Sequence, residues 1–172
     1  LKNQLADFYT NYFQAGEKTW ILFFAIHPYN TKKFITTTEF EMTVPFQMPD
    51  DQKFIYFLRN NIEEEFRFDH WNLRMDFGSF EKDPELRFVP NTTPHVIGDV
   101  IYMDRNQSLD EFDTQWTIRH EFAGILGFPD CYQEFYDTST NSFVNYQLDT
   151  TDLMCSRAGK MNERIYKELK RV

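Results

Sequence analysis

The residues best suited to catalysis lie in the segment His120–Asp130, which reads HEFAGILGFPD. His120 offers an imidazole, Glu121 a carboxylate directly beside it, and Asp130 a second carboxylate ten positions after the histidine. Imidazole and carboxylate groups are common zinc ligands, and a glutamate beside a zinc-bound water can act as a general base. Helical zinc sites of this type carry a second histidine four positions after the first, on the same helix face. Gly124 occupies that position, so one expected ligand is missing.

A longer pattern points to the same site. Gly127 stands seven positions after His120, and Asp130 stands ten after it. The segment resembles the extended signature of the metzincin metallopeptidases, H-E-x-x-H-x-x-G-x-x-H/D, in the snapalysin-like form with Asp as the last ligand. The resemblance implies that His120 and Asp130 bind Zn²⁺ and that Glu121 is the catalytic base. It also implies that Gly127 turns the chain so that the last ligand faces the metal.

A second segment fits the same family. Asp152–Ser156 (DLMCS) lies downstream of the helix and resembles the tight methionine-containing turn that metzincins place beneath the metal. The resemblance implies that Met154 is the methionine of this Met-turn. The alternative is that Met154 fills core space, which is the usual role of this residue type.

The chain has two cysteines, and each follows a residue of the implied site: Cys131 follows Asp130, and Cys155 follows Met154. Because the resemblance brings both elements to the floor of the metal site, we expect a Cys131–Cys155 disulfide, worth roughly 3 kcal/mol of stability. Free thiols in a cytosolic protein are the alternative. A disulfide favours a secreted or periplasmic setting, and Leu1 in the place of Met fits the removal of a leader.

The missing ligand leaves two functional hypotheses. The first is a zinc endopeptidase that hydrolyses peptide bonds and completes its metal shell with another group. The candidates for that group are His70, His95, Tyr132 and Glu134, each of which could instead be an ordinary surface or hydrogen-bonded residue. The second is a catalytically inactive relative that binds a peptide or protein, because losing one ligand weakens zinc binding by a factor on the order of a thousand. In both cases an extended peptide could add to the predicted strand Val96–Met103.

The elements that position these residues are predicted from hydrophobic periodicity and from helix-end signals. The helix that carries His120 should begin near Ser108 or Asp110 and end at Leu126, because a glycine and a proline follow closely. Strands are predicted at Trp20–Ile26, Lys33–Phe46, Leu73–Phe80, Leu86–Pro90 and Val96–Met103. Further helices are predicted at Gln4–Phe13, from Asp51 to Phe66 and from Met161 onward. A polar loop is predicted at Asp137–Asp152.

This order of elements predicts a single α+β domain over residues 1–172. The resemblance makes the expected fold zincin/metzincin-like, with a twisted mixed β-sheet, an active-site helix, a Met-turn and a C-terminal helix. The sheet and the active-site helix would form an N-terminal subdomain over residues 1–130. The Met-turn and the final helix would form a C-terminal subdomain over residues 131–172.

Composition and charge exclude some classes of partner. The chain has 172 residues, of which 41% are hydrophobic, so it can build a core. Its net charge of −9 would repel phosphate backbones, so we expect no nucleic-acid partner. The most apolar run, Trp20–Ile26, is far shorter than the ~20 residues of a membrane span, so no span is expected.

Overall fold

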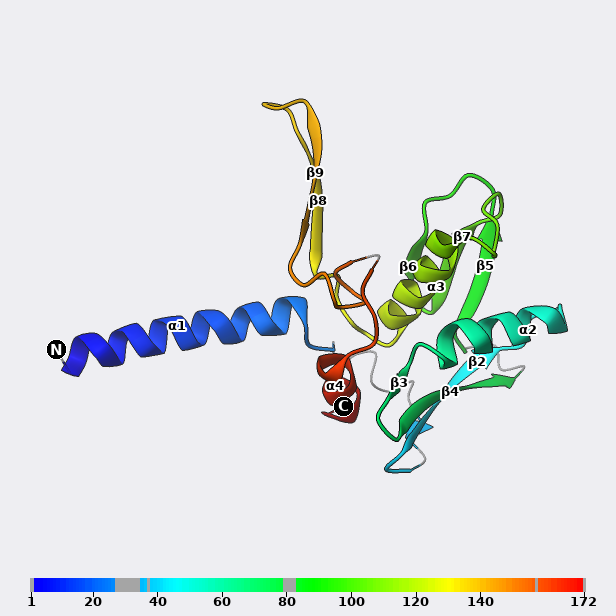
Figure 1. Ribbon diagram of the computed structural model, residues 1–172, viewed down its shortest axis with the longest axis horizontal. Coiled ribbons are helices and arrows are strands. Elements are labelled where there is room, and N and C mark those ends of the chain that lie inside the picture. The colour runs from blue at the N-terminus through cyan, green and yellow to red at the C-terminus, as the bar shows by residue number, and fades with distance from the viewer. Residues whose placement is uncertain (1, 27–34, 37, 79–82, 157, 172) are drawn as a thin grey trace.

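The computed structural model describes residues 2–26, 35–36, 38–78, 83–156 and 158–171 (Figure 1). In this part of the chain the fold is α+β, with helices beside small mixed sheets. The helices are α1 (Lys2–Phe23), α2 (Gln52–Leu58), which continues into the π-helical turn η2 (Arg59–Glu63), α3 (Phe112–Ile125) and α4 (Glu163–Arg171). The strands are β1 (Ile35–Thr36), β2 (Glu41–Gln47), β3 (Arg67–Phe68), β4 (Trp71–Gly78), β5 (Glu85–Val89), β6 (His95–Ile97), β7 (Val100–Asp104), β8 (Tyr132–Asp137) and β9 (Ser142–Gln147).

Two of the sheets carry the core. The first has the order β1-β2-β4-β3, with β2 and β4 parallel, and β2 alternates so that Met42, Val44 and Phe46 are buried. The second has the order β5-β7-β6, with β5 parallel and β6 antiparallel to β7. Within the described residues β6 pairs with β7 alone, so β6 is an edge strand.

Helix α3 packs against β6, β7 and η2 through its apolar face. Phe122 is fully buried and meets the ring of Phe66 edge to face at 5.5 Å. The helix ends as predicted: Gly127 adopts a φ of 99°, a left-handed conformation that favours glycine. This exit redirects the chain after α3 toward Asp130.

The predicted strand Trp20–Ile26 is wrong. Helix α1 runs through Gly16 and ends only at Phe23, so it also extends beyond the predicted helix Gln4–Phe13. Trp20 and Phe24 show why: their rings lie 5.1 Å apart on successive turns, and the Phe24 N–H donates to the Trp20 carbonyl at 2.8 Å. A short apolar run satisfies helix and strand patterns equally well. Figure 1 shows α1 extending away from the sheets.

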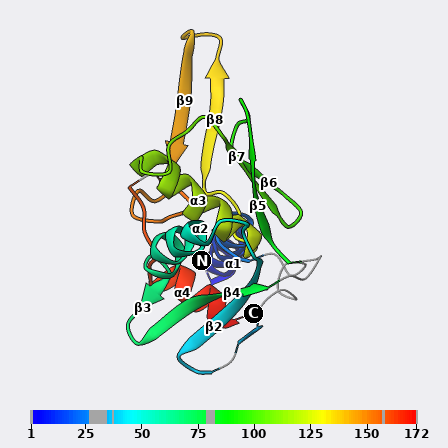
Figure 2. The same ribbon diagram turned by 90° about the vertical axis from the view of Figure 1, so that its right-hand side faces the viewer.

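Two other predictions are wrong because the chain forms hairpins at these positions. The predicted single strand Val96–Met103 is the hairpin of β6 and β7, because Gly98 adopts a φ of 61° and reverses the chain. The predicted polar loop Asp137–Asp152 contains β9, which pairs with β8. The Asp137 carboxylate holds the turn by accepting hydrogen bonds from the backbone N–H and hydroxyl of Ser139. Figure 2 shows this second hairpin projecting from the body beside α3.

The predicted single strand Lys33–Phe46 is also wrong, because its described residues form two strands that pair antiparallel, and the other predicted elements are present with shifted ends. The predicted strand Lys33–Phe46 corresponds to β1 and β2, while its residues 33–34 and 37 lie outside the described part, as do residues 79–80 of the predicted strand Leu73–Phe80. Helix α2 begins directly after Asp51, the start of the predicted helix, because Asp51 Oδ1 caps it by accepting a hydrogen bond from the Lys53 N–H at 2.9 Å. Among the described helices, none has the length and apolarity needed to cross a membrane.

Candidate functional site

The predicted base and metal ligands, Glu121, His120 and Asp130, line one cleft of about 450 Å³, here called the central cleft. Its walls are the edge strand β6 and the C-terminal half of α3, and the segment 127–132 closes one end. The lining includes His95, His120, Glu121, Gly124, Asp130 and Tyr132. The fold therefore brings together residues from β6, α3 and the segment that follows α3.

His120 is buried and sits between two oxygen acceptors. Its Nε2 lies 3.0 Å from Asp130 Oδ1, and its Nδ1 lies 3.2 Å from the Leu153 carbonyl oxygen. A neutral imidazole carries only one N–H. When the ring is doubly protonated, it donates to both oxygen atoms.

The surroundings of His120 favour its charged form. Burial of the ring lowers its pKa, but the hydrogen bond and charge of Asp130, the charge of Glu121 and the Leu153 carbonyl outweigh burial and raise the pKa above its ordinary value. The rings of Trp116 and Tyr132 lie 5.1 and 5.7 Å from the imidazole. The result is a buried imidazole beside two aromatic rings, paired with an exposed Asp130 carboxylate.

Glu121 lies in the central cleft beside this pair. Burial raises its pKa, and the charge of Asp130 adds to that effect, while His120 and His95 oppose it. A carboxyl group with a raised pKa can accept and return a proton near neutral pH, as a general base must. The position and electrostatics of Glu121 are thus compatible with the predicted role.

Gly124 leaves the third ligand position without a side chain, although space is available there. A Cβ atom built on Gly124 would meet only Val96 Cγ2, at an ordinary contact distance of 3.6 Å. The glycine lines the central cleft one helical turn after His120. The fold therefore leaves room for a Cβ atom at the position where the motif carries its second histidine.

The described residues fit a zinc ion only in part. The 3.0 Å separation of His120 Nε2 and Asp130 Oδ1 suits two ligands of one ion, and a second ring nitrogen bonded to a backbone carbonyl is typical of metal-ligating histidines. A catalytic zinc site usually has three protein ligands. Within the described residues no third ligand converges on this pair. They therefore do not complete a catalytic zinc site.

One group of three metal-ligating residue types does converge elsewhere in the described chain: Cys131, Asp152 and Cys155, with ligand atoms within 4.8 Å of one another. The two cysteines form a disulfide, whose sulfur atoms are not thiolates. The Asp152 carboxylate is moreover occupied by Arg164, which it contacts at 2.7 Å. In the oxidised protein this group is structural, and its members are not the predicted ligands.

Of the four predicted replacement ligands, three lie in or beside the central cleft and one lies elsewhere. His95 and Tyr132 line the central cleft, and Glu134 lines a smaller hollow beside it. His95 Nδ1 bonds the Thr93 carbonyl at 2.6 Å, so in a neutral ring Nε2 remains free to accept. Burial, followed by nearby carboxylates, raises the pKa of Tyr132 to about 12, so its phenol stays protonated. His70 lies in another hollow, with 85% of its side chain exposed, and does not belong to this site.

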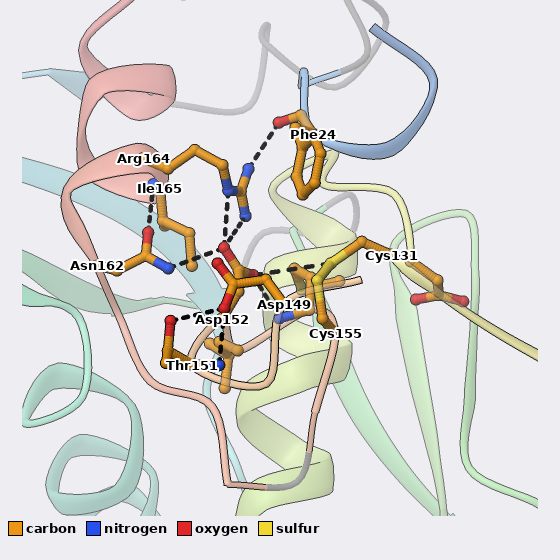
Figure 3. The surroundings of a disulfide bond; sticks show 12 residues. Phe24, Cys131, Asp149, Thr151, Asp152, Cys155, Asn162, Arg164 and Ile165 are labelled. Carbon is orange, nitrogen blue, oxygen red and sulfur yellow. Dashed lines mark hydrogen bonds and ion pairs between the residues drawn. A yellow bond between two sulfur atoms is a disulfide. The ribbon is translucent and has the colours of Figure 1, made fainter. Parts of the chain in front are cut away.

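The residues around Met154 form a tight turn next to His120, in which the Cys155 N–H donates to the Asp152 carbonyl at 3.0 Å; Figure 3 shows the surroundings of this turn at Asp152 and Cys155. Met154 is fully buried, and the neighbouring Leu153 carbonyl contacts His120. The expected Cys131–Cys155 disulfide is present, with a Cα–Cα distance of 4.5 Å. The Cys131 N–H also donates to the Met154 carbonyl at 3.2 Å. The segment that carries Asp130 is therefore tied to this turn by a covalent bond and a hydrogen bond.

Sequence reasoning missed the buried carboxylate that shapes this turn. Asp152 Oδ1 accepts from the Met154 N–H at 2.9 Å, while Oδ2 accepts from Asn162 Nδ2 at 2.8 Å and Arg164 Nε at 2.7 Å. Arg164 in turn donates to the Phe24 carbonyl at 2.7 Å (Figure 3). The available signal was an aspartate two positions before Met154, because Asp commonly accepts from the backbone N–H two residues on.

Comparison of the chain with protein-family models, with curated proteins and with solved structures finds no match. The functional argument therefore depends on the residues of the cleft and on their geometry.

Proposed function

We propose that the central cleft binds an extended polypeptide segment alongside β6, and that the domain is of the metzincin metallopeptidase type with an incomplete zinc site. The observation that carries this proposal is the position of β6. This edge strand lines the same cleft as His120, Glu121 and Asp130. Its outer side offers backbone N–H and C=O groups to an added strand, which is a common mode of peptide recognition.

Binding without hydrolysis is the activity best supported by this geometry. Hydrolysis in this class requires a metal to activate water, and the described residues supply two of the usual three ligands. A proton on His120 Nε2 competes with a metal, because Nε2 must lose it before it can coordinate an ion, and the raised pKa of His120 strengthens this competition. The domain is therefore proposed to act as a peptide- or protein-binding module.

A zinc endopeptidase with an atypical site is the second candidate. Two observations favour it: Glu121 lines the cleft together with His120 and Asp130, and His120 Nδ1 contacts a backbone carbonyl, a contact common to metal-ligating histidines. An extracytoplasmic location is proposed for both candidates, since the chain contains a disulfide.

Zinc content and peptide binding, measured on the same preparation, separate the candidates. The protein is purified without chelators, its zinc is quantified, and randomised peptide pools are tested for binding by fluorescence polarisation and for cleavage by mass spectrometry. Binding with neither zinc nor cleavage supports the module. Stoichiometric zinc that is lost in His120→Ala, with cleavage that is lost in Glu121→Gln, overturns it in favour of the peptidase.

The strand-addition geometry has its own control. A bound peptide is resynthesised with N-methyl groups on alternate residues, in each of the two registers. One register should abolish binding and the other should leave it largely intact, because only alternate N–H groups of an added strand face β6. Equal binding of both N-methylated peptides would rule out strand addition.

A further inference from the structure

A smaller hollow adjoins the central cleft and is here called the side hollow. It encloses about 170 Å³ and shares Pro94, His120, Glu121 and Tyr132 with the central cleft. Pockets for drug-sized ligands occupy about 300–1,000 Å³, so this hollow suits one side chain of a larger ligand. A polypeptide lying along β6 could therefore place a side chain in it.

The hairpin of β8 and β9 supplies one wall of the side hollow. Tyr132 and Glu134 alternate onto one face of β8, and Asn145 and Gln147 lie opposite them on β9. Glu134 pairs with Asn145, whose Nδ2 donates to Glu134 Oε1 at 2.5 Å. This bond orients the carboxylate and leaves its other oxygen able to accept from a ligand.

The chemistry of the side hollow is aromatic and acidic. Its lining includes the aromatic side chains of Trp116 and Tyr132, which can attract a cation through their ring faces, and the carboxylates of Glu121 and Glu134. Among the described residues of its lining, His120 is the one basic residue, and it is paired with Asp130. No Lys or Arg is among the described residues that line either the central cleft or the side hollow.

The arginine nearest in sequence points elsewhere. Arg119 precedes His120 on α3, but its Nη1 contacts Glu65 Oε2 at 3.0 Å and its Nε contacts Asn61 Oδ1 at 2.7 Å. The carboxylates of the side hollow therefore receive no compensation from this guanidinium. Aromatic rings beside carboxylates form an environment that favours a long basic side chain.

We infer that the side hollow is a specificity subsite for a Lys or Arg side chain of the polypeptide bound in the central cleft, with Glu134 as its main anionic partner. The inference rests on the proposed function and names the class of peptide that the cleft selects. Glu134 is a specificity residue in this scheme and has no part in any bond-making step.

The test uses fluorescein-labelled decapeptide pools that are randomised except for a fixed central Arg, Lys, Gln or Glu. Fluorescence polarisation with the intact chain should give Arg and Lys pools that bind about tenfold tighter than the Gln pool, as expected for a charge-assisted pair in a partly enclosed site. Glu134→Gln should reduce this preference to less than about threefold. Glu17→Gln removes the same charge on the exposed surface of α1 and should leave the preference unchanged.

Charge reversal guards against a trivial loss of folding. Glu134→Lys should invert the order, so that the Glu pool binds best, and misfolding cannot produce such an inversion. Equal affinity of the wild type for all four pools, or a basic preference that survives both Glu134 variants, overturns the subsite. Failure of every pool to bind overturns the proposed function itself.

Discussion

At the scale of single residues, the contact between His120 and Asp130 leads to a prediction about pH. The raised pKa of His120 means that the folded state holds its proton more tightly than the unfolded chain does, whose pKa is near 6.5. The stabilisation from the pair is therefore complete below pH 6.5 and is lost as the pH rises through the folded-state pKa. Urea unfolding at pH values below and above 6.5 measures the stability, and an NMR titration of the imidazole measures the pKa of His120.

Asp130→Asn is the matched control for the pH prediction. It removes the carboxylate and keeps the shape of the side chain, so the His120 pKa should fall and the stability should lose much of its dependence on pH in this range. A wild-type imidazole that titrates at or below 6.5 would contradict the protonated pair described above.

Gly124 gives a second prediction at this scale. Gly124→His should complete the zinc ligand set, because the position lines the cleft and has room for a Cβ atom. Zinc affinity measured by competition with a chromophoric chelator should rise about 100- to 1,000-fold. Gly124→Ala is the control: it should gain up to about 1 kcal/mol in helix stability and no zinc affinity. Equal zinc binding by the His and Ala variants would argue against a metal position at this site.

Arg164 gives the third prediction. Its guanidinium neutralises Asp152, a carboxylate with only 1% of its side chain exposed. Arg164→Met would leave that charge buried without its partner and should cost about 3–5 kcal/mol in the free energy of unfolding. Lys167→Met breaks the exposed pair with Glu163 and should cost at most about 1 kcal/mol. Urea unfolding of both variants tests this difference. Equal losses in the free energy of unfolding would show that the buried pair stabilises the fold no more than the exposed pair does.

At the scale of elements, the sequence predicts those that have strong end signals. Helix α3 ends at the expected place because Gly127 adopts the left-handed conformation, and α2 begins after its aspartate cap. The disulfide is also predicted, although only through the family resemblance. The predictions fail where strands are very short, as in β6, or where an apolar run such as Trp20–Ile26 has no clear period. The Asp152–Arg164 pair depends on tertiary packing, so local patterns do not reveal it.

The disulfide gives a prediction at the element scale, because it joins the segment after α3 to the turn beneath His120. Its cysteines are 24 positions apart, and the chain-entropy model assigns a loop of this size about 3–4 kcal/mol. The double variant Cys131→Ala, Cys155→Ala should lose about that much stability in urea unfolding. Wild type unfolded in dithiothreitol should show a similar loss, whereas no change in either sample would mean that the bond adds little to the fold.

At the scale of the whole molecule, both predicted subdomains, residues 1–130 and 131–172, contribute residues to the central cleft. Its walls come from β6 and α3, which precede residue 131, whereas Tyr132 of its lining follows it, and the Leu153 carbonyl of the later turn contacts His120. Glu134 reaches the side hollow from the β8–β9 hairpin, which projects from the body (Figure 2). Peptide specificity is thus proposed to depend on an element that lies outside the core and outside the motif that first indicates the site.

The charge of the whole chain leads to the last prediction. A net charge of −9 at neutral pH produces a field that attracts cationic peptides from a distance, and salt screens this field over about 8–10 Å at physiological strength. The association rate of the Arg pool should therefore fall about tenfold from low to physiological salt, while the rate of the Gln pool changes much less. Stopped-flow fluorescence measures both rates.

Glu134→Gln removes a single charge from the total, so it should raise the dissociation rate and leave the salt dependence of association nearly intact. A dissociation rate unchanged by this substitution would show that long-range attraction alone selects basic peptides, without a contact in the side hollow.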